Sequence, residues 1–171
     1  MVSLGPYNQS YDLSYMYNIR DLRTPYTPCM GTPNTLLSLI RQNPDFSIFN
    51  RILTLSKLDR VLNSSQFNGT IFVPSDAYLE TKITRDIIIN MDIATARNII
   101  NYSILKSRVD ERILTSSPIS YFNSLHSRLL VENINGETLL DKNTKIVKYN
   151  VSLSNGIIHV TDNLLIPYIM T

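Results

Sequence analysis

The chain has 171 residues, of which 43% are apolar and 18% charged, and its net charge is +2. This length suits one ordinary domain with a buried core, and the composition is that of a globular protein. A charge so close to neutral, with no run of Lys or Arg, argues against a nucleic-acid partner. No apolar stretch approaches the roughly 18 residues of a membrane span.

The residue types that bind metals or form disulfides are scarce. Cys29 is the single cysteine, so an internal disulfide and a Cys-based zinc site are excluded, and His126 and His159 are the two histidines. Cys29 lies between Pro28 and Met30, with no cationic neighbour to make it a thiolate. No phosphate-binding loop is present. We therefore expect no metal, no cofactor and no small-molecule substrate.

The first residues, Met1 to Asn8, have no basic start followed by an apolar run, so they do not resemble a signal peptide. This favours a location inside the cell or within a virion over secretion. Asn-X-Ser/Thr sequons point the other way, but a chain this rich in Asn, Ser and Thr produces sequons by chance. They occur at Asn8, Asn63, Asn68, Asn101 and Asn150.

Residues 1–33 differ from the rest of the chain. They hold four of the eight prolines and five of the ten tyrosines, and apolar residues are scattered among them without a period. Proline disfavours helices and central strands, so an extended arm is expected, with a short helix possible over residues 10–23. Disordered tails are usually charged and poor in aromatics, which this segment is not. We expect the arm to bind partner proteins through Tyr7, Tyr11, Tyr15, Tyr17 and Tyr26.

Residues 34–168 have the periodicity of a folded domain, and residues 169–171 form a short tail. Helices are expected near residues 36–40, starting at Asn34, near 49–53, starting at Ser47, and after Asp92. Residues 70–73 read as a buried strand that ends at Pro74, with Ser75 capping the next helix.

The last third of the chain is rich in strand signals. Expected strands cover residues 129–132, 138–140, 145–148, 151–153 and 157–160. Asn135-Gly136 and Asn155-Gly156 are typical of tight hairpin turns, because both residue types tolerate positive φ. Helices followed by a meandering sheet predict an α+β fold.

Two sequence blocks in this order resemble the fasciclin domain, a family of adhesion and matrix modules. The first is Gly69-Thr70-Ile71-Phe72-Val73-Pro74-Ser75-Asp76-Ala77-Tyr78, and the second runs from Ser154-Asn155-Gly156 through His159 and Asp162 to Pro167. The resemblance covers about residues 33–168. It implies N-terminal helices packed on a β-wedge of short, mostly antiparallel strands. The matching family positions are Thr70, Phe72, Pro74, Asp76, Tyr102, Asn155, Gly156, His159, Asp162 and Pro167.

The resemblance also implies a place for receptor recognition. In the family, a Tyr-His pair at the end of the central helix is linked to cell-surface receptor binding. The matching positions here are Tyr102 and Ser103, so the histidine is missing, and no Arg-Gly-Asp is present either. We expect Tyr102 to be a core tyrosine and integrin-type recognition to be absent.

Three functions remain open. The first is a non-catalytic structural protein that binds neighbouring proteins in a large assembly, such as a minor protein of a virus capsid. The alternative is a secreted adhesion or matrix protein. The third and least supported is a hydrolase built on Ser75, His159 and Asp162. No Gly-X-Ser-X-Gly elbow surrounds Ser75, and the family is generally non-catalytic, so no catalytic residues are assigned.

Overall fold

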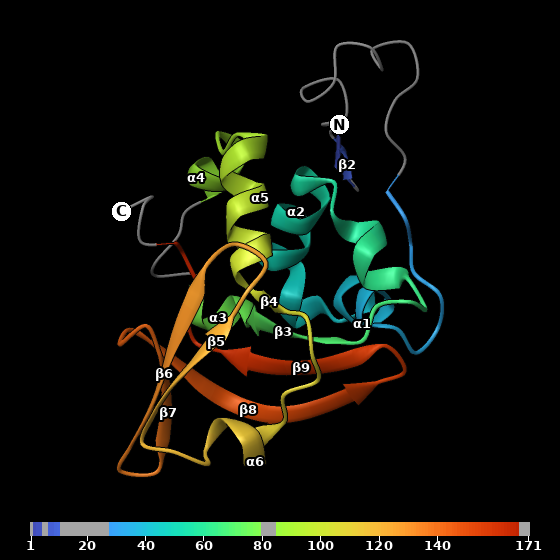
Figure 1. The fold of residues 1–171 in the computed structure, drawn as a ribbon. Helices are drawn as coiled ribbons and strands as arrows, with labels where there is room; N and C mark the ends of the chain where they lie inside the picture. The colour runs from blue at the N-terminus through green and yellow to red at the C-terminus, as the bar shows by residue number, and fades with distance from the viewer. Residues whose placement is uncertain (1, 5–6, 11–27, 80–84, 168–171) are drawn as a thin grey trace.

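The computed structural model describes residues 2–4, 7–10, 28–79 and 85–167. The helical segments are α1 (Leu36–Gln42), η3 (Pro44–Phe46), α2 (Ser47–Ser56), η4 (Asp59–Asn63), α3 (Asp76–Leu79), α4 (Arg85–Ile89), α5 (Ile93–Tyr102) and α6 (Glu111–Leu114). In Figure 1 most helices, α1, α2, α4 and α5 among them, lie above the sheet, and α6 lies below it. Helices and a mostly antiparallel sheet thus occupy separate layers, which confirms the predicted α+β fold.

The helix starts follow local capping rules, with one correction. Asp92 caps α5 as predicted, because its carboxylate accepts a hydrogen bond from the Thr95 amide at 2.7 Å. The cap of α1 is Thr35 and not Asn34. Thr35 forms a capping box with Ser38, whereas Asn34 has a φ of 68° and lies outside the helix.

The strands form a seven-stranded sheet in the order β4-β3-β9-β8-β7-β6-β5. Neighbours are antiparallel except β3 and β9, which are parallel. The N-terminal strands β1 (Val2–Leu4) and β2 (Tyr7–Ser10) pair separately with each other. The sheet strands are β3 (Gly69–Pro74), β4 (Ile104–Leu105), β5 (Ile119–Asn123), β6 (Arg128–Ile134), β7 (Glu137–Leu140), β8 (Thr144–Leu153) and β9 (Gly156–Thr161).

Two details of the sheet differ from the sequence prediction. Residues 145–148 and 151–153 belong to one strand, β8, whose pairing with β9 shifts register around Asn150, a residue with a φ of 61°. An irregular strand of this kind reads as two strands in a sequence pattern. The strand β5 lies in a segment for which no strand was predicted.

The core consists of two clusters separated by β3 and β9. One cluster packs the helices on the sheet and includes Leu36, Phe49 and Ile99. The other cluster joins β3 to β6, β7 and the start of β8, and it includes Phe72 and Val131. All six residues of β3 are buried, as are all six of β9. Successive side chains of β3 therefore enter different clusters, as a strand covered on both faces requires.

Candidate protein-interaction surface

The family position Asp76 caps a helix that precedes it in the chain. Its carboxylate accepts hydrogen bonds from the Ser47 amide (3.2 Å), the Ile48 amide (2.9 Å) and the Ser47 hydroxyl. The first amides of a helix have no partner within it, so Asp76 satisfies the N-terminus of α2 and ties it to α3. Ser47 was predicted to cap this helix, but it is the first residue of α2 and receives its cap from Asp76.

Thr70 holds the chain that leaves β4. Its buried hydroxyl donates to the Ser107 carbonyl at 2.8 Å and accepts from the Val109 amide at 2.7 Å. Both of these backbone groups lie in the irregular segment between β4 and α6. The conformation of that segment is therefore fixed by a side chain of β3.

Asn155 and Gly156 join the last hairpin to the first helix. The Asn155 side chain accepts from the Leu36 amide at 2.8 Å and donates to the Leu62 carbonyl at 2.8 Å. The pair was predicted to adopt positive φ, and it does not. Glycine is required for space instead, because a Cβ at Gly156 would lie 2.5 Å from the Gly69 carbonyl oxygen and 2.6 Å from Leu36 Cδ1.

His159 is fully buried between the rings of Phe72 and Tyr149, each with its centroid 5.8 Å away. Its Nδ1 accepts from the Asn150 amide at 3.1 Å, and its Nε2 lies 2.7 Å from the Val109 carbonyl oxygen. An amide donates and a carbonyl accepts, so the ring is neutral with its proton on Nε2. Neither nitrogen is available to a metal ion.

This environment predicts a pH dependence of stability. Burial lowers the pKa of His159 below its usual 6.5, although the Val109 carbonyl, Asp110 and Glu111 oppose the shift. Below about pH 6.5 the unfolded chain then binds a proton that the folded chain does not, so acid favours unfolding. We expect the free energy of unfolding to fall from pH 7 to pH 5.5 and His159→Gln to flatten that slope. Urea titrations at each pH measure it, and equal slopes for both proteins would contradict the assignment.

The three residues of the hypothetical hydrolase site do not form a triad. Both ring nitrogens of His159 face backbone groups, and Asp162 accepts a hydrogen bond from the Lys145 amide at 2.8 Å. Ser75 follows Pro74, which pairs with Thr161 at the end of β3, and its amide donates to the Thr161 carbonyl. The last family position, Pro167, is buried after β9.

Tyr102 links the end of α5 to the turn after β7. Its hydroxyl contacts the Asp141 carboxylate and lies 3.2 Å from the Arg128 carbonyl oxygen. Burial, followed by the contact with Asp141, raises the pKa of Tyr102. Ser103 is also buried, and its hydroxyl donates to the Ile99 carbonyl at 2.8 Å. The position of the family's receptor-binding pair is therefore occupied by core residues in this chain.

The described residues contain neither a metal-type cluster, in which three His, Cys, Asp or Glu side chains could hold an ion, nor a helix long and apolar enough to span a membrane. A pocket of about 320 Å³ lies beside Thr35, Asn63 and Asn155, and its lining contains neither charged side chains nor histidine or cysteine. Its serine and threonine hydroxyls have no acidic or basic side chain in the lining that could activate them as nucleophiles.

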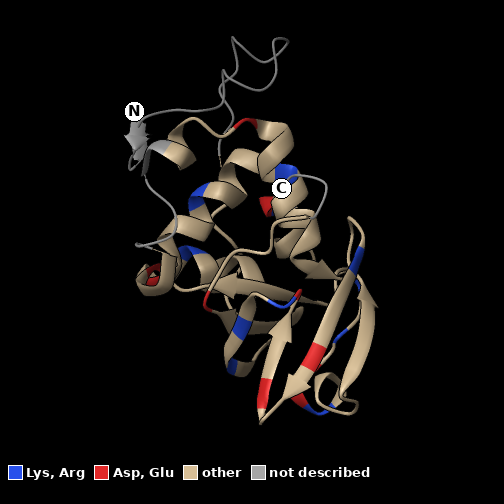
Figure 2. Cartoon of the chain, turned by 90° about the vertical axis from the view of Figure 1, so that its left-hand side faces the viewer, with Lys and Arg blue, Asp and Glu red and all other residues tan. Residues whose placement is uncertain are grey.

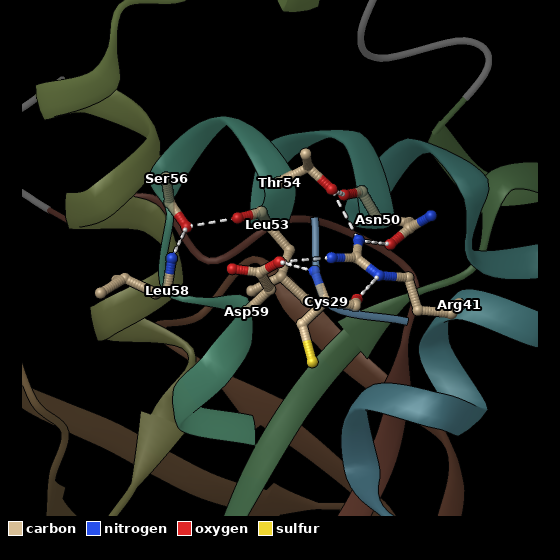
Figure 3. Close-up of polar contacts among 8 residues, drawn as sticks. All are labelled: Cys29, Arg41, Asn50, Leu53, Thr54, Ser56, Leu58 and Asp59. Atoms are coloured by element: carbon tan, nitrogen blue, oxygen red, sulfur yellow. Dashed lines mark hydrogen bonds and ion pairs between the residues drawn. The ribbon is translucent and has the colours of Figure 1, made fainter. Parts of the chain in front are cut away.

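The end of the arm nearest the domain is firmly attached to it. The Arg41 guanidinium pairs with Asp59 at 2.6 Å and donates to the Cys29 carbonyl at 2.9 Å, and Asp59 accepts from the Cys29 amide at 3.1 Å (Figure 3). The Thr32 amide donates to Asn63. Residues from Cys29 onward therefore pack with the folded domain, although the predicted boundary followed Pro33. Of the five predicted arm tyrosines, Tyr7 begins β2, and Tyr11, Tyr15, Tyr17 and Tyr26 lie outside the described residues.

An apolar surface lies on the outward face of β5, β6 and β7. Directly opposed residues share a face of a sheet, and the register pairs Ile119 with Glu132 and Tyr121 with Leu130. Ile119, Tyr121 and Ile134 are 58%, 56% and 46% exposed, while the opposite face of the same strands is buried in the core. We call this surface the outer patch. Its apolar members are Ile119, Tyr121, Leu130, Ile134 and Leu139.

Charged residues lie within and around the outer patch, and Glu132 lies between Ile119 and Leu139 in one cross-strand row. Lys145 lies 3.1 Å from Glu137, Lys142 lies 3.8 Å from Glu132, and the Arg128 guanidinium lies 4.4 Å from the centre of the Tyr121 ring. Figure 2 shows both basic and acidic positions on the strands of the sheet. The sequence analysis missed this surface because it placed no strand at β5. The alternation of Ile119 and Tyr121 after Pro118 is the signal that could have revealed it.

Comparisons with known proteins agree with this architecture. A family model described as the fasciclin domain matches residues 44–167. A solved structure of a FAS1 domain pair from the insect cell adhesion molecule fasciclin I superposes with a TM-score of 0.66 at 20% sequence identity, over 79% of this chain and 51% of that one. The chain thus spans about half the length of that structure. No curated protein matches this chain. With the family blocks at the positions that build its core, the chain belongs to the fasciclin domain family.

Proposed function

We propose that this protein is a non-catalytic interaction domain of the adhesion type, and that the outer patch is a partner-binding surface. The observation that carries the proposal is the contrast between two groups of residues. The polar family positions described above form hydrogen bonds that stabilise the fold, whereas apolar side chains are exposed together on β5, β6 and β7. Exposed apolar side chains that gather on one face of a sheet are typical of protein interfaces.

Tyr121 is expected to be the main anchor of this surface. Aromatic and arginine side chains dominate binding energy at many interfaces, and a tyrosine buries a large area while only two torsions become fixed. The Arg128 guanidinium already lies over the Tyr121 ring, so both side chains are arranged before a partner arrives. Such preorganisation lowers the entropic cost of binding.

The comparisons support the adhesion reading better than the assembly reading. Fasciclin domains are generally associated with adhesion and protein interaction, and the matching solved structure comes from a cell adhesion molecule. A capsid or virion role, which the sequence suggested, has no support among these similarities. The likeness at 20% identity establishes the fold, so the adhesive activity of this chain is our proposal.

Residues 1–33 supply a second binding element in this proposal. Five tyrosines with interleaved apolar residues provide many anchors, and the prolines restrict the chain before it binds. The hydrogen bonds of Cys29 to Arg41 and Asp59 attach this segment to the helical side of the domain. The arm is attached at α1 and η4, whereas the outer patch lies on β5, β6 and β7. The two can therefore be tested separately.

The outer patch is tested by cell attachment to surfaces coated with the protein. We expect Ile134→Lys combined with Leu139→Thr to reduce attachment at least about tenfold, in line with the loss of interface anchors. The matched control is Ile89→Lys, which places the same charge on an exposed isoleucine of α4. Attachment equal to that of the wild type, with an unchanged melting temperature, would remove the patch from the proposal.

The arm is tested in the same assay by replacing Tyr7, Tyr11, Tyr15 and Tyr17 with serine. The melting temperature should stay within a few degrees of the wild type, since the substitutions lie before the anchored Cys29. Attachment should fall, because truncating an anchor typically costs about 2 kcal/mol. If attachment were unaffected, residues 1–27 would not be a binding element.

A further inference from the structure

Within the residues that the structure describes, no strand pairs with the outer edge of β5. In an antiparallel pair, alternate residues direct their N–H and C=O groups to the neighbouring strand and the others direct theirs away. The Asn133 amide donates to the Pro118 carbonyl at 2.8 Å and the Ser124 amide to the Ser127 carbonyl at 3.0 Å. Both bonds fit the register of β5 with β6. The even-numbered residues of β5 are therefore the ones whose backbone groups bond to β6. The backbone groups of Ile119, Tyr121 and Asn123 therefore point away from β6.

Nothing in β5 protects this edge. Monomeric proteins usually guard edge strands with charged residues, proline, bulges or very short strands. The five residues Ile119–Asn123 contain no charge and no proline, and their pairing with β6 is regular. The opposite edge of the sheet, β4, has only two residues, and its Leu105 forms a bridge with Ser124. In the described part of the chain, β5 is thus the long unprotected edge.

We propose that β5 pairs antiparallel with β5 of a second copy of this chain, about a two-fold axis at Tyr121. In this register each Tyr121 faces its symmetry mate and each Ile119 faces the second copy's Asn123. Ile119, Tyr121 and Asn123 then each belong to a hydrogen-bonded pair across the interface, and each pair exchanges two backbone hydrogen bonds. The two sheets join into one continuous sheet, and the two outer patches lie side by side on the same face.

Charge complementarity favours a second copy in this orientation. Arg128 lies opposite Asn123 on β6, and Glu132 lies opposite Ile119. The two-fold pairing therefore places Arg128 in one cross-strand row with the second copy's Glu132, three strand spacings or about 14 Å apart between backbones. At this separation the attraction between the two charges is weak and is screened by salt. Parallel pairing would instead turn the second copy's outer patch to the opposite face of the joint sheet.

The dimer is expected to be weak. Specific interfaces usually engage about 20–30 residues a side, whereas β5 contributes five. A weak homotypic contact of this kind is useful where many copies are held on a surface, because multivalency raises the overall strength. The inference does not rest on the proposed adhesive function, since the 171-residue chain in solution would form the same dimer.

Sedimentation velocity of the 171-residue chain, from about 1 µM to about 1 mM, tests the dimer and its register. The strength of dimerisation is compared between two double variants. Ile119→Lys with Asn123→Lys places like charges opposite each other at both outer pairs, whereas Ile119→Lys with Asn123→Glu places opposite charges there. The first should dimerise at least about tenfold more weakly than the second. Tyr121→Pro removes an outward N–H without touching the bonds to β6, so it should abolish the dimer while the circular dichroism spectrum is retained.

Three outcomes would overturn the proposal. A chain that stays monomeric throughout the concentration range has no homotypic edge contact. Dimerisation that resists Tyr121→Pro uses another surface. Association that is lost in Tyr121→Pro but is equally strong in both charge variants means that β5 receives a different strand, such as the arm of a neighbour. Sedimentation of the Ile134→Lys, Leu139→Thr variant, which leaves β5 unchanged, separates failure of the dimer from failure of the adhesive function.

Discussion

Replacing Phe72 by alanine is expected to lower the free energy of unfolding by about 3–5 kcal/mol. The Phe72 side chain is 1% exposed and belongs to the core cluster that joins β3 to β6, β7 and β8. Removing it leaves a cavity beside His159, whose ring packs on Phe72. The strand cannot shift to fill that space, because it is hydrogen-bonded to β9 on one side and β4 on the other.

Urea denaturation followed by circular dichroism measures this loss. Tyr78→Ala is a suitable control, because this aromatic residue is exposed on α3 and its truncation should cost well under the core value, about 0.5 kcal/mol. A loss below about 1 kcal/mol for Phe72→Ala would show that the site collapses after truncation. The assignment of β3 as a rigid central strand would then be wrong.

The second large effect is expected at the buried ion pair of Arg41 and Asp59. Their side chains are 5% and 0% exposed, and the guanidinium also donates to the Cys29 carbonyl and to Thr54. Removing one member of a buried pair leaves the other charge without its partner in a poorly hydrated site, at a cost of about 3–5 kcal/mol. We expect Arg41→Met to show a loss of that size, although the apolar part of the side chain is kept.

A matched control is Lys145→Met, which breaks the exposed pair with Glu137 and should change stability by less than about 1 kcal/mol. Hydrogen exchange provides a second measurement. The Cys29 amide donates to Asp59, so its protection should be lost in Arg41→Met before the core amides of β3 are affected. If Cys29 exchange were unchanged, the ion pair would not be what attaches the start of the domain.

The elements that the sequence predicted correctly depend on short stretches of chain. The apolar period and the Asp92 cap specify α5 within its own residues. Residues Asn135 and Gly136 have φ values of 53° and 80°, as the predicted hairpin requires. The blocks around Phe72 and His159 identified the family, because strands buried on both faces leave a continuous apolar pattern.

The features that only the tertiary structure decided join residues far apart in the chain. Asp76 caps a helix that begins 29 residues earlier, and the space that excludes a Cβ at Gly156 is filled by Leu36. The partner of Arg41 and the outer edge of β5 likewise follow from which elements become neighbours. Sequence by itself determined the fasciclin fold, since local propensity and burial pattern specify each element. The exposed surfaces depend on how those elements pack, so the candidate interface emerged only from the structure.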